Sequence, residues 1–275
     1  MVFAFPQGRN SAELNNPINH HDQPLLLALD TAARCTGVAL ARGERMIARL
    51  AVEGDERRSE RLWLDIAELL EGAGLGVEAV DLFAVCVGPG GFTGLRVGIA
   101  AVKGMAAATG KPVAAVTSLE AAAMAANGTA TVCAMVGAYK GEAYSQLFTF
   151  DARGLPVARS APVVSTSSEA VAQVADLHEV VFVGDAAEAN VEMIREIAGA
   201  RFLDETGGNG DGWRVRHATQ SVAEAVARVA YLKWQRGAVE AATAVEALYV
   251  RPAEAEVKRS QGLLGSKIAR SRRGD

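Results

Sequence analysis

The feature that most constrains the fold is a glycine-rich segment, Gly88–Gly98, which reads Gly-Pro-Gly-Gly-Phe-Thr-Gly-Leu-Arg-Val-Gly. The apolar run Val80–Val87 before it predicts a buried strand, and the residues from about Thr93 to Ala108 predict a helix. Glycines permit positive φ and close backbone approach, and a helix N-terminus offers free N–H groups to an anion. The segment matches neither a Walker A loop nor a GxGxxG motif, so the motif alone does not assign a phosphate site. Two interpretations stay open: a tight structural turn, or a loop that faces a phosphate.

The predicted helix after the loop is unusual because most of its surface is small. Glycines within it lower helix propensity but let another backbone come close. Two explanations remain for this surface: close packing within the fold, or a helix-to-helix interface with a partner. The small residues are Gly98, Ala100, Ala101, Gly104, Ala106, Ala107 and Ala108.

The order of the other predicted elements suggests a duplicated α/β architecture, in which mixed sheets are flanked by helices. Predicted strands are Leu25–Asp30, Thr36–Ala41, Met46–Val52, Val113–Val116, Ala130–Ala138, Ala143–Phe150 and Val180–Val183. Predicted helices are Glu56–Glu71, Ser118–Ala126 with Ser118 as N-cap, Ser167–Asp176, Ala186–Ala198 and Ser221–Gln235. Glu205–Arg216 is rich in Gly and Asp and predicts a loop, and a hinge between lobes is expected near Gly110–Ser118.

Composition restricts the class of protein. The chain has 275 residues, enough for one large domain or two lobes. It contains no stretch of roughly 18 apolar residues and no secretory signal, so neither a membrane span nor export is expected. Residues 1–23 indicate a disordered leader. Three widely spaced cysteines, Cys35, Cys86 and Cys133, predict buried small side chains rather than a metal site or disulfides, which favours the cytoplasm.

Charge is distributed unevenly along the chain. Val257–Asp275 carries six basic residues and one acid, so the rest has 22 basic and 31 acidic residues and a net charge of −9. A basic tail on an acidic body can contact RNA or can simply be a solvated, flexible end, which we place at residues 253–275.

Three segments carry a resemblance to a known family. Leu29–Ala32, Gly88–Gly98 and Pro112–Glu120 resemble the TsaB family, also called YeaZ, whose members are paralogues of the TsaD or Gcp-like proteins. The resemblance is clear over Leu25–Phe150 and weaker beyond, where Tyr249-Val250-Arg251 is similar to the family's closing signature.

The resemblance implies an actin-like, sugar-kinase-like and Hsp70-like ATPase fold with two ribonuclease H-like lobes. Residues 24–110, completed by a helix at 219–236, would form the first lobe and residues 111–216 the second. In such folds the carboxylate of the first strand, here Asp30, and the adjoining turn often face a nucleotide. For Asp30 we favour a structural role closing the turn through Thr31. Residues placed to face a nucleotide are Asp30, Thr31, Gly90, Gly91 and Thr93.

The resemblance also implies that this chain is not the catalyst. TsaD-like paralogues carry a His-x-x-x-His metal pair, and Ser118 and Ala122 stand at those positions. None of the four histidines is paired at i, i+4, and no nucleophile elbow is present. We therefore expect no catalytic residue, no metal and no cofactor held by this chain, with ATP at a complex interface left open.

The family works in the transfer of threonylcarbamoyl to adenosine 37 of tRNAs that read codons starting with A. The resemblance implies that the chain forms a heterodimer with a TsaD-like paralogue and a homodimer when alone. A TsaE-like ATPase is expected as a further partner, and an adenylate-forming TsaC-like enzyme is expected to act upstream. Contact with tRNA is expected through the complex. The expected interface is Arg61, Leu62, Ile66, Leu69, Leu95, Gly98, Ala101, Val102, Gly104 and Met105. The rival functions are an ATP-dependent small-molecule kinase and a metalloprotease-like enzyme.

Overall fold

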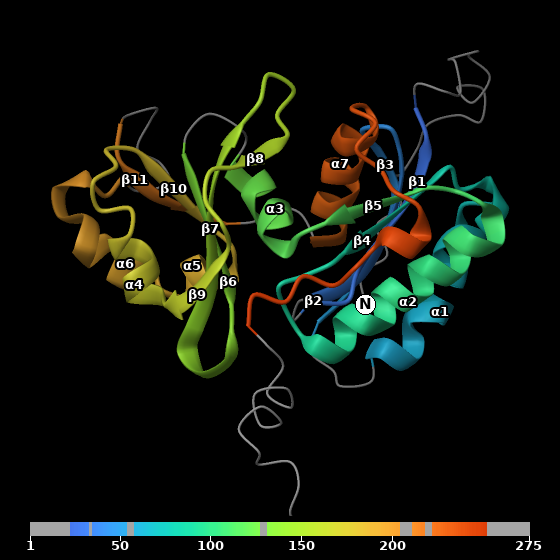
Figure 1. Cartoon of the computed structure of the whole chain (residues 1–275), viewed down its shortest axis with the longest axis horizontal. Coiled ribbons are helices and arrows are strands. Elements are labelled where there is room, and N and C mark those ends of the chain that lie inside the picture. Colours follow the sequence, from blue (N-terminus) through green and yellow to red (C-terminus); the bar gives the residue numbers. More distant parts are fainter. Residues whose placement is uncertain are drawn as a thin grey trace, which may run out of the picture.

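A computed structural model describes residues 23–32, 35–53, 58–126, 131–203, 211–217 and 222–251. The predicted leader and the basic tail lie outside the described residues, apart from Gln23. Figure 1 shows two lobes side by side, each built on its own sheet. Within the described residues no helix is long and apolar enough to cross a membrane.

The first sheet has the order β3-β2-β1-β4-β5. Strands β1 to β3, which match three of the predicted strands, form an antiparallel meander, and β4 and β5 run parallel to β1. The bounds are β1 Leu25–Asp30, β2 Cys35–Arg42, β3 Arg45–Glu53, β4 Leu82–Cys86 and β5 Val113–Val116. Because β5 pairs with β4, residues 113–116 belong to the first sheet, although the lobe boundary was expected at residue 110.

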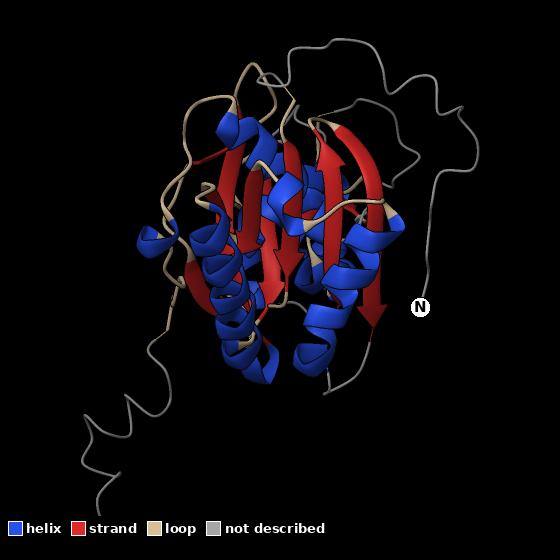
Figure 2. Cartoon of the chain, turned by 90° about the vertical axis from the view of Figure 1, so that its right-hand side faces the viewer, coloured by secondary structure: helices blue, strands red, loops and turns tan. Residues whose placement is uncertain are grey.

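Helices cover both faces of the first sheet, which explains why its central strands are apolar throughout. Leu27, Leu29 and Val85 share one core cluster with α1 (Arg58–Gly72) and α2 (Phe92–Thr109). Leu26, Ala28 and Ala84 alternate to the other face and share a cluster with α7. α7 (Val222–Trp234) thus returns to the first sheet after the chain has built the second. Figure 2 shows α1 and α2 in front of the strands, on the outer side of the molecule.

The second sheet repeats the first, with order β11-β10-β6-β7-β8 and β9 added to β7. β7 is antiparallel to β6, whereas β10 and β11 extend the sheet in parallel, just as β2 and β4 flank β1. The bounds are β6 Val132–Gly137, β7 Glu142–Phe150, β8 Pro156–Ala158, β9 Val163–Thr166, β10 Val180–Val183 and β11 Trp213–Arg216. The predicted strands Ala130–Ala138 and Ala143–Phe150 correspond to β6 and β7, which pair antiparallel, and the duplicated α/β architecture is confirmed.

Three local predictions need correction, and two short strands were not predicted. The N-cap of α3 (Ser118–Ala123) is Thr117, whose side chain accepts from the Glu120 N–H in a capping box, rather than Ser118. The predicted helix Ala186–Ala198 is two helices, α5 Asp185–Ala189 and α6 Val191–Ala198, separated at Asn190. Part of the predicted loop Glu205–Arg216 is strand β11, and the short strands β8 and β9 carried no clear sequence pattern.

In addition to α3, which contacts both α7 and β6, two contacts hold the lobes together. Leu155, in the turn between β7 and β8, is buried in the same core cluster as α7, and Asp151 forms an ion pair with Arg236 after that helix. At the other end the chain passes from α7 to the segment Val245–Arg251, which we call the strap. Figure 1 shows this red segment crossing the first lobe toward the second.

Candidate functional site

The glycine-rich loop joins β4 to α2 and is anchored by α3 and the strap. Gly88 has a φ of +100° and is followed by a cis bond to Pro89. Ser118 donates its backbone N–H to the Gly88 carbonyl (2.9 Å) and its hydroxyl to the Pro89 carbonyl (2.5 Å). On the strap, the Leu248 N–H donates to the Val87 carbonyl at 2.7 Å. The loop therefore has a fixed shape set by residues far away in sequence.

The close approach permitted by the glycines is made by the chain's own β1–β2 turn. A Cβ on Gly94 would overlap the Thr31 carbonyl oxygen, and one on Gly98 would overlap the Thr31 hydroxyl. A Cβ on Gly90 would lie 3.0 Å from Ala32. The Thr31 hydroxyl donates to the Gly94 carbonyl (2.7 Å), so the turn is bonded to α2. This packing accounts for Gly90, Gly94 and Gly98 without a ligand.

Asp30 is fully buried at the end of β1. Its Oδ1 accepts the Ala32 N–H at 3.0 Å, a contact within the turn one residue beyond the Thr31 position that was expected. Cys86 lies beside it, and burial first, then the charge of Asp30, raises the pKa of the Cys86 thiol well above its ordinary value. Of the other residues predicted to face a nucleotide, Gly91 and Thr93 are exposed and Gly90 and Thr31 are half-buried. A nucleotide-facing role for them stays a prediction.

The positions that correspond to the paralogue's histidines are structural here. Ser118 is buried against the glycine loop, and Ala122 has no ligand atom. Among the described residues, no group of three His, Cys, Asp or Glu side chains could hold a metal ion. His217 lies in the second lobe, with Nδ1 3.1 Å from a Glu188 oxygen, and His20 and His21 lie outside the described residues.

The residues predicted to form a partner interface divide into two groups. Arg61 and Gly104 are exposed, and a Cβ on Gly104 would meet nothing within 4 Å. The other eight are buried in the lobe and belong to its own packing: Leu62, Ile66, Leu69, Leu95, Gly98, Ala101, Val102 and Met105. An interface on these helices must therefore use their outer surface.

That outer surface carries two large apolar side chains that sequence reasoning missed. Trp63 and Leu64 on α1 are 55% and 58% exposed. On α2 the exposed residues include Ala100, Gly104, Ala107 and Ala108. The sequence could have revealed them, because Trp63 and Leu64 fall between Leu62 and Ile66, two buried positions of the apolar stripe of α1. We call this set, Trp63, Leu64, Ala100, Gly104, Ala107 and Ala108, the α1–α2 outer face.

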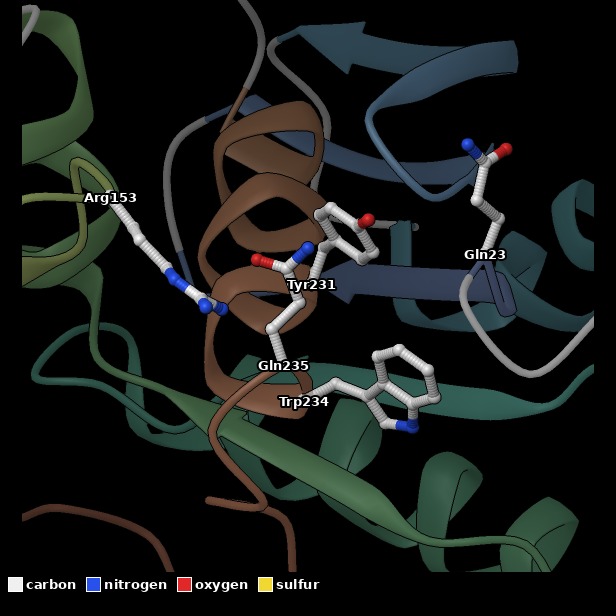
Figure 3. A pocket seen from close by; sticks show the side chains of 5 residues that line it. All are labelled: Gln23, Arg153, Tyr231, Trp234 and Gln235. Carbon is white, nitrogen blue, oxygen red and sulfur yellow. The ribbon is translucent and has the colours of Figure 1, made fainter. Parts of the chain in front are cut away.

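An open pocket of about 450 Å³ lies at the opposite end of β1 from the glycine loop. Figure 3 shows Tyr231 and Trp234 from α7 and Gln235 just after it, with Arg153 and Gln23 at its sides. The two aromatic rings are stacked with centroids 6.3 Å apart. Gln23 precedes β1 and Asp30 ends it, so about 20 Å of strand separates the pocket from the loop. The pocket is not the place where this fold would hold nucleotide phosphates beside Asp30.

Comparison with known proteins supports the family resemblance. The family profile described as TsaD, tRNA N6-adenosine threonylcarbamoyltransferase, matches residues 54–153. The tRNA threonylcarbamoyladenosine biosynthesis protein TsaB of Haemophilus influenzae is 42% identical over 103 residues, 37% of this chain and 42% of that protein. The protein of the same name from Bacillus subtilis is 30% identical over 128 residues, 46% and 55% of the two chains. The chain thus spans about half the length of the curated relatives it matches.

A solved structure extends the likeness to both lobes. It comes from Pseudomonas aeruginosa, is described as an uncharacterized protein with similarity to peptidase YEAZ, and is 26% identical with a TM-score of 0.66. The comparison covers 83% of this chain and 100% of that one. With the duplicated sheets, this identifies the two-lobed fold of the actin, sugar-kinase and Hsp70 class. In its glycine-loop motif, its fold and its matches to these relatives, the chain is similar to the TsaB (YeaZ) family.

Proposed function

We propose that this chain is a non-catalytic subunit of the complex that transfers threonylcarbamoyl to adenosine 37 of tRNAs reading codons that start with A. It binds a TsaD-like paralogue and holds it in an active arrangement. The observation that carries the proposal is the α1–α2 outer face, where Trp63 and Leu64 of α1 are more than half exposed and α2 carries exposed small residues.

The chemistry of the outer face suits a second helical surface. Exposed Trp is enriched among the residues that dominate binding energy, because it offers a large apolar area. Small residues such as Ala100 and Gly104 let a partner helix approach closely. Arg61 and Glu68 border this surface and supply a polar rim. A paralogue with the same lobe architecture would present two comparable helices, and a second copy of this chain could occupy the face when the paralogue is absent.

The non-catalytic role is supported by what Ser118 and the glycine loop do. Ser118 uses both its N–H and its hydroxyl to fix the loop, so it serves packing where the paralogue has a metal ligand. The space that a Cβ would occupy at Gly90, Gly94 and Gly98 is taken by atoms of Thr31 and Ala32. In this proposal the metal, the adenylate made by a TsaC-like enzyme and any ATP used with a TsaE-like ATPase belong to the other subunits or to their boundary with this chain. The kinase alternative instead predicts ATP turnover by the isolated chain.

The test compares two surface substitutions in the full chain. Gly104→Arg places a long side chain on the outer face without an internal clash, and Ala172→Arg does the same at an exposed position of α4 in the second lobe. We expect Gly104→Arg to weaken binding of the paralogue at least about 100-fold and Trp63→Ala about 10-fold or more, with Ala172→Arg unchanged. Folding is checked by thermal unfolding, and binding by titration calorimetry.

Activity provides the second readout. Threonylcarbamoyladenosine formation in tRNA is measured with the paralogue and the adenylate-forming enzyme, with and without this chain. We expect formation to require the chain and to recover with Trp63→Ala at high concentration, because mass action then restores the pair. The proposal fails if folded Gly104→Arg binds the paralogue normally, or if omission of the chain changes nothing.

A further inference from the structure

The open pocket at the far end of β1 from the glycine loop is lined by residues of both lobes. Tyr231 and Trp234 belong to the last turn of α7, Gln235 follows it, Gln23 precedes β1, and Arg153 lies in the turn between β7 and β8 of the second lobe. With a volume of about 450 Å³, the pocket lies in the size range of sites for small molecules. Neither the proposed pairing with the paralogue nor the packing of the glycine loop uses it.

One wall of the pocket is aromatic. Tyr231 and Trp234 lie three residues apart on α7, so both rings project from the same side of the helix. Their planes are 15° from parallel, with ring centroids 6.3 Å apart. Tyr231 is buried in the core cluster that α7 shares with the first sheet, and Trp234 packs against the same cluster. The core and the mutual contact thus fix the orientation of the rings before a ligand arrives, which lowers the entropic cost of binding.

The other lining residues bring polar side chains that the protein itself does not use. Within the described part of the chain, the side chains of Gln23, Arg153 and Gln235 make no hydrogen bond or ion pair. Figure 3 shows the Arg153 side chain reaching from the second lobe toward the end of α7. A guanidinium carries five N–H donors, and each carboxamide carries two donors and an acceptor oxygen. The pocket therefore combines an aromatic wall with unused hydrogen-bonding capacity.

The backbone that carries Arg153 is fixed. Oδ1 of Asp151 accepts the N–H groups of Arg153 (2.8 Å) and Leu155 (3.0 Å), and the Asp151 N–H donates to the Leu155 carbonyl at 3.1 Å. Leu155 is buried in the core cluster that contains Tyr231. The turn is therefore docked on α7 with its backbone already ordered. A ligand has to order only the side chain of Arg153.

Charge identifies the class of ligand. Arg153 is the one charged residue among the five that line the pocket. The neighbouring cation Arg236 is paired with Asp151, so its charge is compensated. A guanidinium without a carboxylate partner can hold a carboxylate through two parallel hydrogen bonds. The pocket borders the C-terminus of α7, whose dipole adds no attraction for an anion. A single guanidinium therefore matches the single charge of a carboxylate better than the two charges that a phosphate can carry.

We propose that this pocket binds a small planar aromatic carboxylate, whose carboxylate is held by Arg153 and whose ring packs on Tyr231 and Trp234. The carboxamides of Gln23 and Gln235 meet polar atoms of the ring. Because Arg153 belongs to the second lobe and the aromatic wall to the first, the bound ligand bridges the two lobes. The site is separate from the α1–α2 outer face, and the proposal does not depend on pairing with the paralogue.

The test measures ligand binding by the full chain with a probe of this chemistry. The probe is indole-2-carboxylate, a planar bicycle with one carboxylate, titrated to about 10 mM in isothermal calorimetry. Two analogues separate the contributions of charge and ring. Indole-2-carboxamide keeps the shape but removes the charge, and cyclohexanecarboxylate keeps the charge but removes the planar ring. Thermal unfolding checks that every variant is folded.

Arg153→Gln and Arg159→Gln form the matched pair, because both remove an exposed arginine of the second lobe and only Arg153 lines the pocket. Arg153→Gln should weaken binding of indole-2-carboxylate about 10-fold or more and change binding of the carboxamide less than about 2-fold, whereas Arg159→Gln should change neither. Arg153→Lys keeps the charge without the planar fork and should fall between wild type and Arg153→Gln. Trp234→Leu should weaken the acid and the amide alike, since it removes part of the aromatic wall.

We expect the wild-type chain to bind the probe at one site with a Kd of roughly 0.1–1 mM, as its size of about a dozen heavy atoms implies, and to bind both analogues more weakly. Bound probe should slow amide hydrogen exchange both in the last turn of α7 and in the turn between β7 and β8, because it links the lobes. The proposal is overturned if no saturable binding occurs, if Arg153→Gln binds the probe like Arg159→Gln, or if the carboxamide binds as tightly as the acid. Slower exchange in only one of the two segments would contradict the bridging of the lobes.

Discussion

At the scale of single residues, the glycine loop shows that one motif can serve several physical needs. Gly88 adopts a positive φ, which L side chains rarely do, whereas Gly94 and Gly98 are required because Thr31 lies against α2. Gly104 on the same helix has open space around it. Helix propensity alone would treat Gly94, Gly98 and Gly104 alike, but their surroundings separate them.

This difference leads to a prediction with opposite signs. Gly94→Ala should destabilise the protein by at least about 2 kcal/mol, because its Cβ would overlap the backbone oxygen of Thr31. Gly104→Ala should stabilise it by about 0.5–1 kcal/mol, since alanine favours the helix and meets no neighbour. Urea unfolding of both variants checks the pair, and a neutral Gly94→Ala would contradict the described approach of the turn.

The sequence limits what could be known of such residues. It located the loop, and it favoured a role for Asp30 in closing the turn through Thr31, whereas the bond that Asp30 accepts comes from the Ala32 N–H. It could not assign the glycines, because the atoms that need the space belong to Thr31, more than 50 residues earlier. It also assigned the N-cap of α3 to Ser118, because nothing local reveals that the Ser118 hydroxyl is used by Pro89.

Cys133 gives a prediction for pH. Burial raises the pKa of its thiol from 9.0 to about 12. The native state therefore keeps its proton where the unfolded chain loses it, so this contribution to stability is complete below pH 9 and declines as the pH rises toward 12. Between pH 8 and 10 the wild type should lose about 1.4 kcal/mol more unfolding free energy than Cys133→Ala, in which the other groups still titrate. Parallel pH profiles for the two proteins would refute this.

At the scale of elements, long periodic segments were predictable and short ones were not. The amphipathic stripe of α1 and the buried strands β1, β4 and β10 follow directly from apolar pattern. Strands β8 and β9 have three and four residues and depend on pairing with β7, and β11 follows a Gly- and Asp-rich stretch. Tertiary pairing, rather than local propensity, makes these segments strands.

The same scale explains why the predicted interface needed revision. Apolar side chains spaced three and four residues apart on α1 and α2 equally suit a core and a docking surface. Whether such a stripe becomes core or docking surface depends on which face of the helix packs on the sheet. The sheet residues that it packs on lie in other parts of the sequence. The buried stripe became the core of the lobe, which left Trp63 and Leu64 outside.

Lys233 provides a test of how α7 is held against its neighbouring elements. Its Nζ donates to the Ala115 carbonyl (2.8 Å) and to Glu120 (2.9 Å), which ties α7 to β5 and α3. Both charged side chains are only 17% exposed, so loss of one leaves the other poorly solvated. Lys233→Met should cost roughly 2–4 kcal/mol of unfolding free energy.

The control for Lys233 is a lysine of similar type in an exposed pair. Lys111 and Asp81 lie 3.4 Å apart with side chains 36% and 42% exposed, and Lys111→Met should cost less than about 1 kcal/mol. Denaturant unfolding measures both variants. Equal losses of unfolding free energy would show that burial of the Lys233–Glu120 pair does not determine how much the pair stabilises the protein.

At the scale of the whole molecule, the chain order binds the lobes into one unit. The first sheet is completed by α7, which follows the second sheet in sequence, and nine residues of α7 are buried. The turn between β7 and β8 of the second lobe then packs Leu155 against this helix, and the strap connects Val87 to Glu142. Opening of one lobe should therefore be transmitted to the other through α7.

Leu155 allows that coupling to be measured. Leu155→Ala removes a side chain that is 7% exposed in the cluster shared with α7, and we expect a loss of roughly 2–3 kcal/mol. The matched control is Val157→Ala, two residues along, where the side chain is 36% exposed and the change should stay within about 0.5 kcal/mol.

The decisive readout is amide hydrogen exchange, because it resolves which segments open. Leu155→Ala should accelerate exchange in the last turn of α7, around Tyr231–Trp234, as well as in β7 and β8, while α6 on the far side of the second sheet changes no more than in Val157→Ala. Exchange confined to β7 and β8 would mean that the hairpin opens alone and that α7 does not couple the lobes. Acceleration in α7 would instead show that the first lobe senses a cavity made in a turn of the second, as expected when one helix serves a core to which both contribute.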